Sequence, residues 1–338
     1  MKEIEEYLND LVLKKIVPGF TYSIIYNNQL VEGSVGLKNI ITKEKTNIND
    51  LYDLASLSKV IATTTIISRM IDKKMIKLND LVIKYLKDFK HKDITILNLL
   101  THTSGLTRLG YKKVVDKENI INDIYSKDKT FETNKDLKYS DLNFIFLGLI
   151  IEKIYNKPLD KVAYEEVFKP LNMISTTYLP SKDKCAPTEL VDSHLIQGEV
   201  HDEKARSMNG VSGHAGVFSN VADLTNLVTM VLNKGVFNNE IYLSEKIIDL
   251  WFKKLAKGHK DKRFRSIGWI VGNNKHIIIR HTNAISFSGF TGPSISIDRK
   301  NNVGIILLTN RVHPTRKNEK IYAYRIKISK FIYDTFKI

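Results

Sequence analysis

Apolar and polar positions divide the chain into an N-terminal helix, two groups of strands and a long helical middle. Apolar residues at helical spacing predict an amphipathic helix that ends near Val17-Pro18-Gly19. Phe20–Tyr26 and Gln29–Gly36 are strand-like, and Asn27-Asn28 between them is typical of a hairpin turn. A polar connection, residues 38–49, then leads towards the helical middle.

The pattern is helical from about residue 56 to about residue 235. Ser56 opens a segment in which Leu57, Val60, Ile61 and Thr64 follow the i, i+3, i+4, i+7 spacing of one helical face. Three further segments share this pattern and predict helices: Asp93–Thr101, Asp141–Tyr155 and Val221–Leu232.

Strand patterns return after Phe264. Two pairs of strands are predicted, Arg265–Val271 with His276–His281 and Pro293–Ile297 with Val303–Thr309, and Ile321–Phe336 closes the chain as an amphipathic helix.

Strands at both ends with helices between them predict an α+β fold, in which both termini contribute to one antiparallel sheet flanked by helices. We expect residues 1–60 and 236–338 to form this discontinuous sheet domain. Residues 61–235 would form a mainly helical insert, with the functional site at the seam between the two.

Composition excludes some function classes. The formal net charge of +15 suggests a nucleic-acid partner, but the basic residues are spread along the chain without a basic block, so no nucleic acid is expected. No apolar run reaches the roughly 18 residues that span a bilayer, and the N-terminus has no signal-peptide pattern. With Cys185 as the single cysteine, these features predict a cytoplasmic protein without a membrane partner.

Ser56 and Lys59 form the most informative motif, S-x-x-K at the start of a predicted helix. This spacing places both side chains on one helical face, where a lysine of lowered pKa could take the serine proton. Two other matches begin at Ser126 and Ser181, in polar surroundings typical of loops. From the motif alone, a simpler interpretation stays open, in which Ser56 is a helix N-cap and Lys59 is solvated.

Several stretches together resemble the serine β-lactamase-related and penicillin-binding superfamily, and within it the class C-like branch with its family VIII esterases and D-aminopeptidases. The resemblance runs over nearly the whole chain and is carried by Ile16-Val17-Pro18-Gly19, Tyr52-Asp53-Leu54-Ala55-Ser56-Leu57-Ser58-Lys59, Leu99-Leu100-Thr101-His102-Thr103-Ser104-Gly105-Leu106, Tyr139-Ser140-Asp141, Gly213-His214-Ala215-Gly216 and Gly289-Phe290-Thr291-Gly292. It implies that Ser56 is an acylated nucleophile and that Lys59 and Tyr139 move its proton. It also implies an oxyanion hole made by the backbone N–H groups of Ser56 and Phe290.

The chain departs from the family pattern at two substrate-binding positions. Asp141 stands where the family's Y-x-N motif has asparagine, which removes an amide donor and adds a carboxylate. The third motif reads Phe287-Ser288-Gly289, so a phenyl ring replaces the lysine or histidine that recognises a substrate carboxylate. The second change weakens the β-lactamase and carboxypeptidase interpretations more than it weakens hydrolase activity.

The resemblance therefore implies a serine hydrolase that acts through an acyl-enzyme, on small esters, amides or peptides, with no cofactor and no metal. A β-lactamase or D-Ala-D-Ala carboxypeptidase is one alternative, and a catalytically silent ligand-binding module is another. His102 and His214 are given no role.

Overall fold

The computed structural model describes residues 2–110, 114–259, 263–272 and 284–338. Within these ranges, nine strands form one antiparallel sheet in the order β10-β11-β12-β13-β14-β15-β1-β2-β3. The strands, in chain order, are β1 (Gly19–Tyr26), β2 (Gln29–Asn39), β3 (Glu44–Lys45), β10 (Ala256–Lys257), β11 (Phe264–Arg265), β12 (Ile270–Val271), β13 (Ile285–Ser288), β14 (Ser294–Asp298) and β15 (Val303–Leu308). The N-terminal strand β1 pairs with the C-terminal strand β15, from Thr21 opposite Leu308 to Tyr26 opposite Val303.

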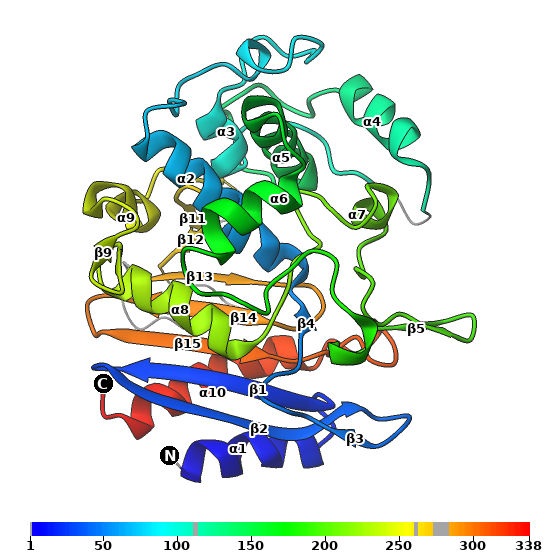
Figure 1. The fold of residues 1–338 in the computed structure, drawn as a ribbon, viewed down its shortest axis with the longest axis vertical. Helices are drawn as coiled ribbons and strands as arrows, with labels where there is room; N and C mark the ends of the chain where they lie inside the picture. Colours follow the sequence, from blue (N-terminus) through cyan, green and yellow to red (C-terminus); the bar gives the residue numbers. More distant parts are fainter. Residues whose placement is uncertain (1, 111–113, 260–262, 273–283) are drawn as a thin grey trace.

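Two terminal helices, α1 (Lys2–Leu13) and α10 (Ile321–Thr335), cover one face of the sheet (Figure 1). Their buried side chains, such as Leu8 and Ile328, pack with Phe20 of β1 and Ile305 of β15 in one apolar cluster. Removal of this apolar surface from water is the main stabilisation of the layer. Because the two helices also contact each other, the chain ends lie on the same side of the molecule.

Helix α8 (Val221–Leu232) covers the opposite face of the sheet and packs on β1 and β15. The approach is close, since a Cβ added to Gly304 of β15 would lie 2.4 Å from Val228 Cγ1. The other helices lie beyond α8 and form the upper half of the molecule in Figure 1. The α-helices there are α2 (Thr65–Asp72), α3 (Ile96–Thr101), α4 (Lys117–Ser126), α5 (Asp141–Tyr155), α6 (Leu159–Ala163), α7 (Glu203–Ser207) and α9 (Glu245–Phe252).

The predicted α+β class and its sheet of N- and C-terminal strands are confirmed. The division of the chain into a sheet domain and a helical insert, with boundaries at residues 60/61 and 235/236, stays a prediction. Helix α8 lies within the predicted insert, and it packs on the sheet. Helices α5 and α8 have the predicted bounds.

Other predicted elements differ from the structure. The helix predicted from Asp93 begins at Ile96, because Thr95 caps it by accepting a hydrogen bond from Asn98 N. The strand predicted over Arg265–Val271 is two strands, β11 and β12, since the chain turns at Gly268 with a φ of +82°. Strand β13 was not predicted, and the predicted strand 276–281 lies outside the described residues.

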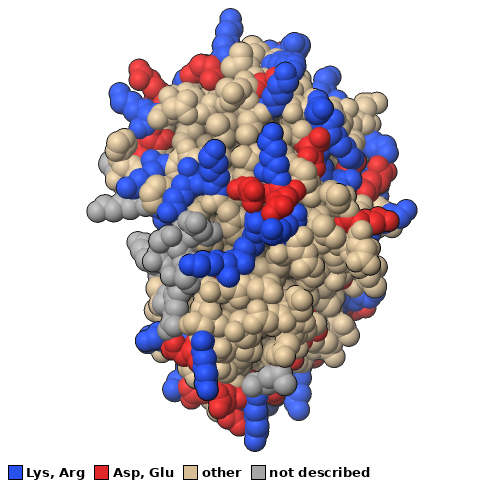
Figure 2. Space-filling model, turned by 90° about the vertical axis from the view of Figure 1, so that its left-hand side faces the viewer, with Lys and Arg blue, Asp and Glu red and all other residues tan. Residues whose placement is uncertain are grey.

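Basic side chains are scattered over the face shown in Figure 2, where acidic side chains lie between them. None of the helices in the described ranges is long and apolar enough to span a membrane.

Candidate active site

A sharp turn of the backbone presents Ser56 at the end of β4 (Tyr52–Asp53), which pairs with β7 (Phe218–Ser219). Ala55, directly before the serine, has a φ of +46°, a conformation that non-glycine residues adopt at an energetic cost. The carboxylate of Asp53 holds this turn by accepting a hydrogen bond from Ala55 N at 2.8 Å. Burial raises the pKa of Asp53 to about 6.

The sequence-predicted residues Ser56, Lys59 and Tyr139 meet in the structure. Lys59 Nζ donates to Ser56 Oγ at 3.1 Å, and Tyr139 OH donates to the same oxygen at 2.9 Å. Lys59 is completely buried, so it is not a solvated lysine, and Ser56 lies inside a helical turn without acting as its cap. This arrangement contradicts the simpler interpretation of the S-x-x-K motif.

The ammonium of Lys59 is held by two further oxygen atoms. Asp141 Oδ1 lies 2.9 Å from Lys59 Nζ, and the carbonyl oxygen of His214 accepts a hydrogen bond at 2.9 Å. Burial lowers the pKa of Lys59, but the carboxylate of Asp141 and the interaction with Tyr139 outweigh this effect and raise the pKa above its ordinary value. Lys59 is therefore protonated in the resting site, so the lowered pKa needed for a free lysine base is not found.

Asp141 belongs to a network of charges that the sequence did not reveal. Lys204 Nζ lies 3.4 Å from Asp141 Oδ2 and 2.9 Å from Asp202 Oδ2, and His214 Nε2 lies 2.9 Å from Asp202 Oδ1. Burial by itself would raise the pKa of Asp141. Lys59, His214 and Lys204 have a larger effect in the opposite direction, so the pKa of Asp141 lies below the usual range. The carboxylate that departs from the family pattern is therefore stabilised by a second lysine, on α7, which no motif marks.

The same network contains the one group of potential metal ligands that the described ranges bring together, namely Asp141, Asp202 and His214, with ligand atoms within 4.8 Å of one another. The ammonium of Lys204 lies against both carboxylates and supplies the positive charge that a metal ion would bring.

His102 supports Tyr139 from behind. Its ring centroid lies 4.6 Å from that of Tyr139, and its Nδ1 lies 3.3 Å from Ser140 N and 2.9 Å from Asn143 Nδ2. Burial lowers the pKa of His102 well below its ordinary value, so the ring is neutral and Nδ1 accepts both hydrogen bonds. We infer that His102 positions Tyr139 at the start of α5.

The segment after β13 is tied to the turn that carries Ser56. Thr291 Oγ1 donates to the carbonyl oxygen of Asp53 at 2.6 Å, and a Cβ added to Gly289 would lie 2.4 Å from Leu54 O. Only glycine permits this approach, which brings Phe290 to the same cleft as Ser56. The oxyanion hole formed by Ser56 N and Phe290 N stays a prediction that this arrangement supports.

The cleft has two lobes that meet at Ser56, Tyr139 and Phe290, each with a volume of about 300 Å³. The mixed-charge lobe is lined by both signs of charge: Asp141, Asp202, Glu203, Lys204 and Arg316. The arginine lobe is lined by Phe287, Ser288 and Gly289 and by four arginines: Arg108, Arg263, Arg265 and Arg325. The motifs that carry the family resemblance do not include these arginines, and the approach of Arg265 and Arg325 to residue 287 depends on the folded sheet and on α10.

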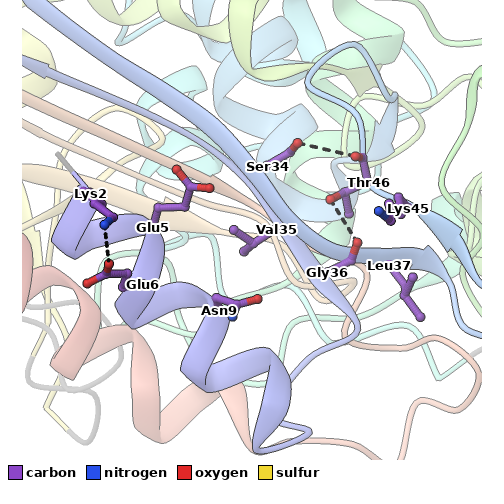
Figure 3. A pocket seen from close by; sticks show the side chains of 10 residues that line it. All are labelled: Lys2, Glu5, Glu6, Asn9, Ser34, Val35, Gly36, Leu37, Lys45 and Thr46. Atoms are coloured by element: carbon purple, nitrogen blue, oxygen red, sulfur yellow. Dashed lines mark hydrogen bonds and ion pairs between the residues drawn. The ribbon is translucent and has the colours of Figure 1, made fainter.

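A separate hollow of about 720 Å³ lies between α1 and the strands β2 and β3 (Figure 3). Four of its polar side chains have partners: Lys2 pairs with Glu6, and Ser34 and Thr46 donate to carbonyl oxygens. The serine of this hollow, Ser34, donates to the carbonyl oxygen of Thr46, and no described lysine or tyrosine is hydrogen-bonded to it, so Ser56 marks the better candidate site.

Comparisons with known proteins agree with this geometry. The family model described as Beta-lactamase matches residues 4–329. A Bacillus subtilis relative, "N-acetylmuramyl-L-alanine amidase", is 32% identical over 315 residues, which are 80% of this chain and 70% of the relative.

Two solved structures share the fold. "EstCE1, a hydrolase with promiscuous acyltransferase activity" has a TM-score of 0.79 and 19% identity, covering 95% of this chain and 98% of that one. A class C beta lactamase from Rhodobacter sphaeroides has a TM-score of 0.77 and 16% identity, covering 98% and 99%. Since the family model spans nearly the whole chain, the protein belongs to the beta-lactamase family of serine hydrolases, as its sequence motifs had indicated.

Proposed function

We propose that this protein hydrolyses small esters or amides through an acyl-enzyme on Ser56. The observation that carries the proposal is the double hydrogen bond to Ser56 Oγ, from Lys59 Nζ at 3.1 Å and from Tyr139 OH at 2.9 Å. A serine hydroxyl becomes a nucleophile when a neighbouring group accepts its proton, and both neighbours are within reach of that proton.

The protonation of Lys59 and Tyr139 determines when Ser56 can react. In the resting site Lys59 is an ammonium, so the Lys59–Tyr139 pair must first lose one proton. Tyr139 oxygen then accepts the proton of Ser56 while Ser56 Oγ bonds to the substrate carbonyl carbon. The ammonium of Lys59 stabilises the negative charge on the neighbouring oxygens.

The proton then passes to the leaving alcohol or amine, whose bond to the carbonyl carbon breaks and leaves an ester on Ser56. A water molecule attacks that ester and gives up a proton through the same pair, which releases the acid and restores the serine hydroxyl. We propose that the backbone N–H groups of Ser56 and Phe290 receive the carbonyl oxygen in both steps.

Amide hydrolysis is supported by the Bacillus subtilis relative, which is named as an amidase. A β-lactamase or D-Ala-D-Ala carboxypeptidase activity is the alternative within the same chemistry. A silent binding module would not need the buried Lys59 or the strained turn at Ala55, both of which cost folding energy. A cytoplasmic location stays a prediction that rests on the lone Cys185.

Labelling with a fluorophosphonate tests the proposal, because only an activated serine reacts with it. We expect one label per chain, located on Ser56 by peptide mass spectrometry. Ser56→Ala should lose labelling and about 10⁶-fold in kcat towards p-nitrophenyl butyrate. Ser126→Ala and Ser181→Ala are matched controls with the same S-x-x-K spacing and should change neither. Turnover that survives in Ser56→Ala would disprove the assignment.

A further inference from the structure

The turn that carries Phe290 into the cleft joins β13 to β14. Within residues 289–293, Gly289 N donates to Pro293 O at 2.8 Å, and Gly292 N donates to Gly289 O at 3.3 Å. Phe290 is 43% exposed, so burial of its ring alone cannot fix the backbone. A backbone donor stabilises a developing oxyanion only when it is held in one orientation, and an error of about 1 Å can cost about 10²-fold in rate.

Two buried arginines hold carbonyl oxygens of the 289–293 turn. Arg311, which follows β15 in the chain, donates from Nε to Phe290 O at 2.7 Å. Arg325 comes from α10, and its Nη2 lies 2.7 Å from Gly292 O and 3.4 Å from Gly289 O. Arg311 is completely buried and Arg325 is 3% exposed, so water does not compete for these hydrogen bonds.

These contacts fix both peptide planes that flank Phe290. In a planar trans peptide, the carbonyl oxygen and the N–H point in opposite directions. The peptide that joins Gly289 to Phe290 is trans, and its oxygen faces Gly292 N and Arg325 Nη2. The N–H of Phe290 therefore points away from Arg325. The following peptide is held through Phe290 O by Arg311, so both backbone dihedrals of Phe290 are set.

Aromatic contacts hold the two guanidinium groups in place. Arg311 Cζ lies 4.4 Å from the ring centroid of Phe290, and the ring of His201 stacks on that of Phe290 at 5.6 Å. The ring of Tyr322 lies against both arginines, 4.8 Å from Arg311 Cζ and 5.2 Å from Arg325 Cζ. Such contacts restrict the plane of a guanidinium, so the arginines form a rigid support beneath the turn.

We propose that Arg311 and Arg325 are positioning residues for the oxyanion hole, which orient the backbone N–H of Phe290 towards the carbonyl oxygen of a substrate bound at Ser56. Both act through the backbone of the turn. Their charges also polarise the carbonyl groups that accept from them, which makes the N–H groups of the turn stronger donors. This role rests on the proposed function, since it needs an oxyanion to form at Ser56.

The rate of fluorophosphonate labelling tests the proposal, because the phosphonyl oxygen of the probe must enter the same hole. Arg311→Lys and Arg325→Lys keep the charge, but an ammonium cannot reproduce the planar fork of a guanidinium. We expect each folded variant to reach one label per chain on Ser56, with a rate constant at least tenfold lower. Loss of a whole oxyanion donor costs about 10²–10³ in kcat, so kcat towards p-nitrophenyl butyrate should fall at least tenfold and KM should change less than threefold.

Two readouts separate positioning from loss of structure. A partly unfolded variant would label to a lower final extent, at the wild-type rate for the chains that do react. Altered proton transfer would move the pH dependence of kcat/KM, whereas misplacement of the Phe290 N–H lowers kcat/KM equally at every pH.

Arg69→Lys is the matched control. Arg69 Nη1 also donates to a backbone carbonyl, Tyr242 O at 2.8 Å, and its Cζ lies 4.4 Å from the ring centroid of Tyr242. It belongs to α2 and is not among the described residues that line the cleft. Arg69→Lys should therefore leave the labelling rate and kcat unchanged.

The two proposals fail separately. A wild-type labelling rate in folded Arg311→Lys or Arg325→Lys would overturn the role of that arginine, while labelling of Ser56 would leave the hydrolase standing. Wild-type protein that is not labelled at all would overturn the hydrolase itself.

Tyr322→Leu decides the test if neither arginine variant folds. It removes the ring against which both arginines lie and removes no buried charge. Labelling of this variant should be at least threefold slower, because cation–π contacts contribute modestly to the support. An unchanged rate would overturn the proposal.

Discussion

Replacement of Asp141 by asparagine should move the pH dependence of the reaction towards acid. Asp141 Oδ1 lies 2.9 Å from Lys59 Nζ, and Coulomb's law with an effective dielectric constant of about 20 gives an attraction of about 6 kcal/mol at this distance. The carboxylate favours the protonated form of Lys59. Without it, the Lys59–Tyr139 pair loses its proton at lower pH.

A displacement of one pH unit corresponds to only about 1.4 kcal/mol, so a quarter of the attraction is enough to produce it. We therefore expect the rising limb of kcat/KM against pH, measured with p-nitrophenyl butyrate, to move by at least one unit towards acid in Asp141→Asn. Asp202→Asn is the matched control, because Asp202 contacts Lys204 and His214, and it should move the limb less.

A limb that stays in place in Asp141→Asn, or that moves towards alkaline pH, would refute this account of the site. It would mean that protonation of Lys59 does not limit the reaction. Thermal unfolding of both variants separates this result from loss of the fold.

Two further predictions concern the proton-transfer pair and the packing behind it. Lys59→Ala and Tyr139→Phe should each lower kcat at least 10²-fold, and the double variant should be much less than multiplicatively worse, because the two residues act as one unit; independent, multiplicative losses would contradict this. Gly213→Ala would place a Cβ 2.1 Å from Phe144 O, and we expect it to lower the free energy of unfolding, measured by urea titration, by about 1–3 kcal/mol. Gly110→Ala is the control, because a Cβ at Gly110 has no atom within 4 Å, and it should leave the free energy of unfolding unchanged. Equal stability of both glycine variants would show that the backbone there yields easily.

The parts of the site that the sequence predicted are those with local signals. Ser56 and Lys59 are three residues apart and lead an apolar helical face, and Tyr139 precedes the amphipathic segment that forms α5. Arg265 and Arg325 could not be predicted, because they lie far apart in the sequence and approach Phe287 only when the sheet and α10 have formed.

The elements of the fold also differ in whether a local sequence signal marks them. Helices α5 and α8 have sequence periodicity over many residues, so their bounds follow from the pattern. Strand β13 has only four residues, Ile285–Ser288; apolar and polar residues alternate along it, but four residues are the shortest run from which a strand can be predicted. The turn at Gly268 likewise depends on contacts with distant parts of the chain, such as the hydrogen bond from Gly268 N to Leu100 O.

The pairing of β1 with β15 has a consequence for synthesis on the ribosome. Tyr26, at the end of β1, is opposite Val303, so about 280 residues must be translated before this edge of the N-terminal hairpin finds its partner. At 5–20 residues per second, that interval is about 14–55 s. During this interval one edge of β1, which carries Phe20, Tyr22 and Ile24, is exposed to other nascent chains. An unpaired apolar strand edge is a template for aggregation. We expect the nascent protein to depend on chaperones that bind extended apolar segments until its last strand emerges.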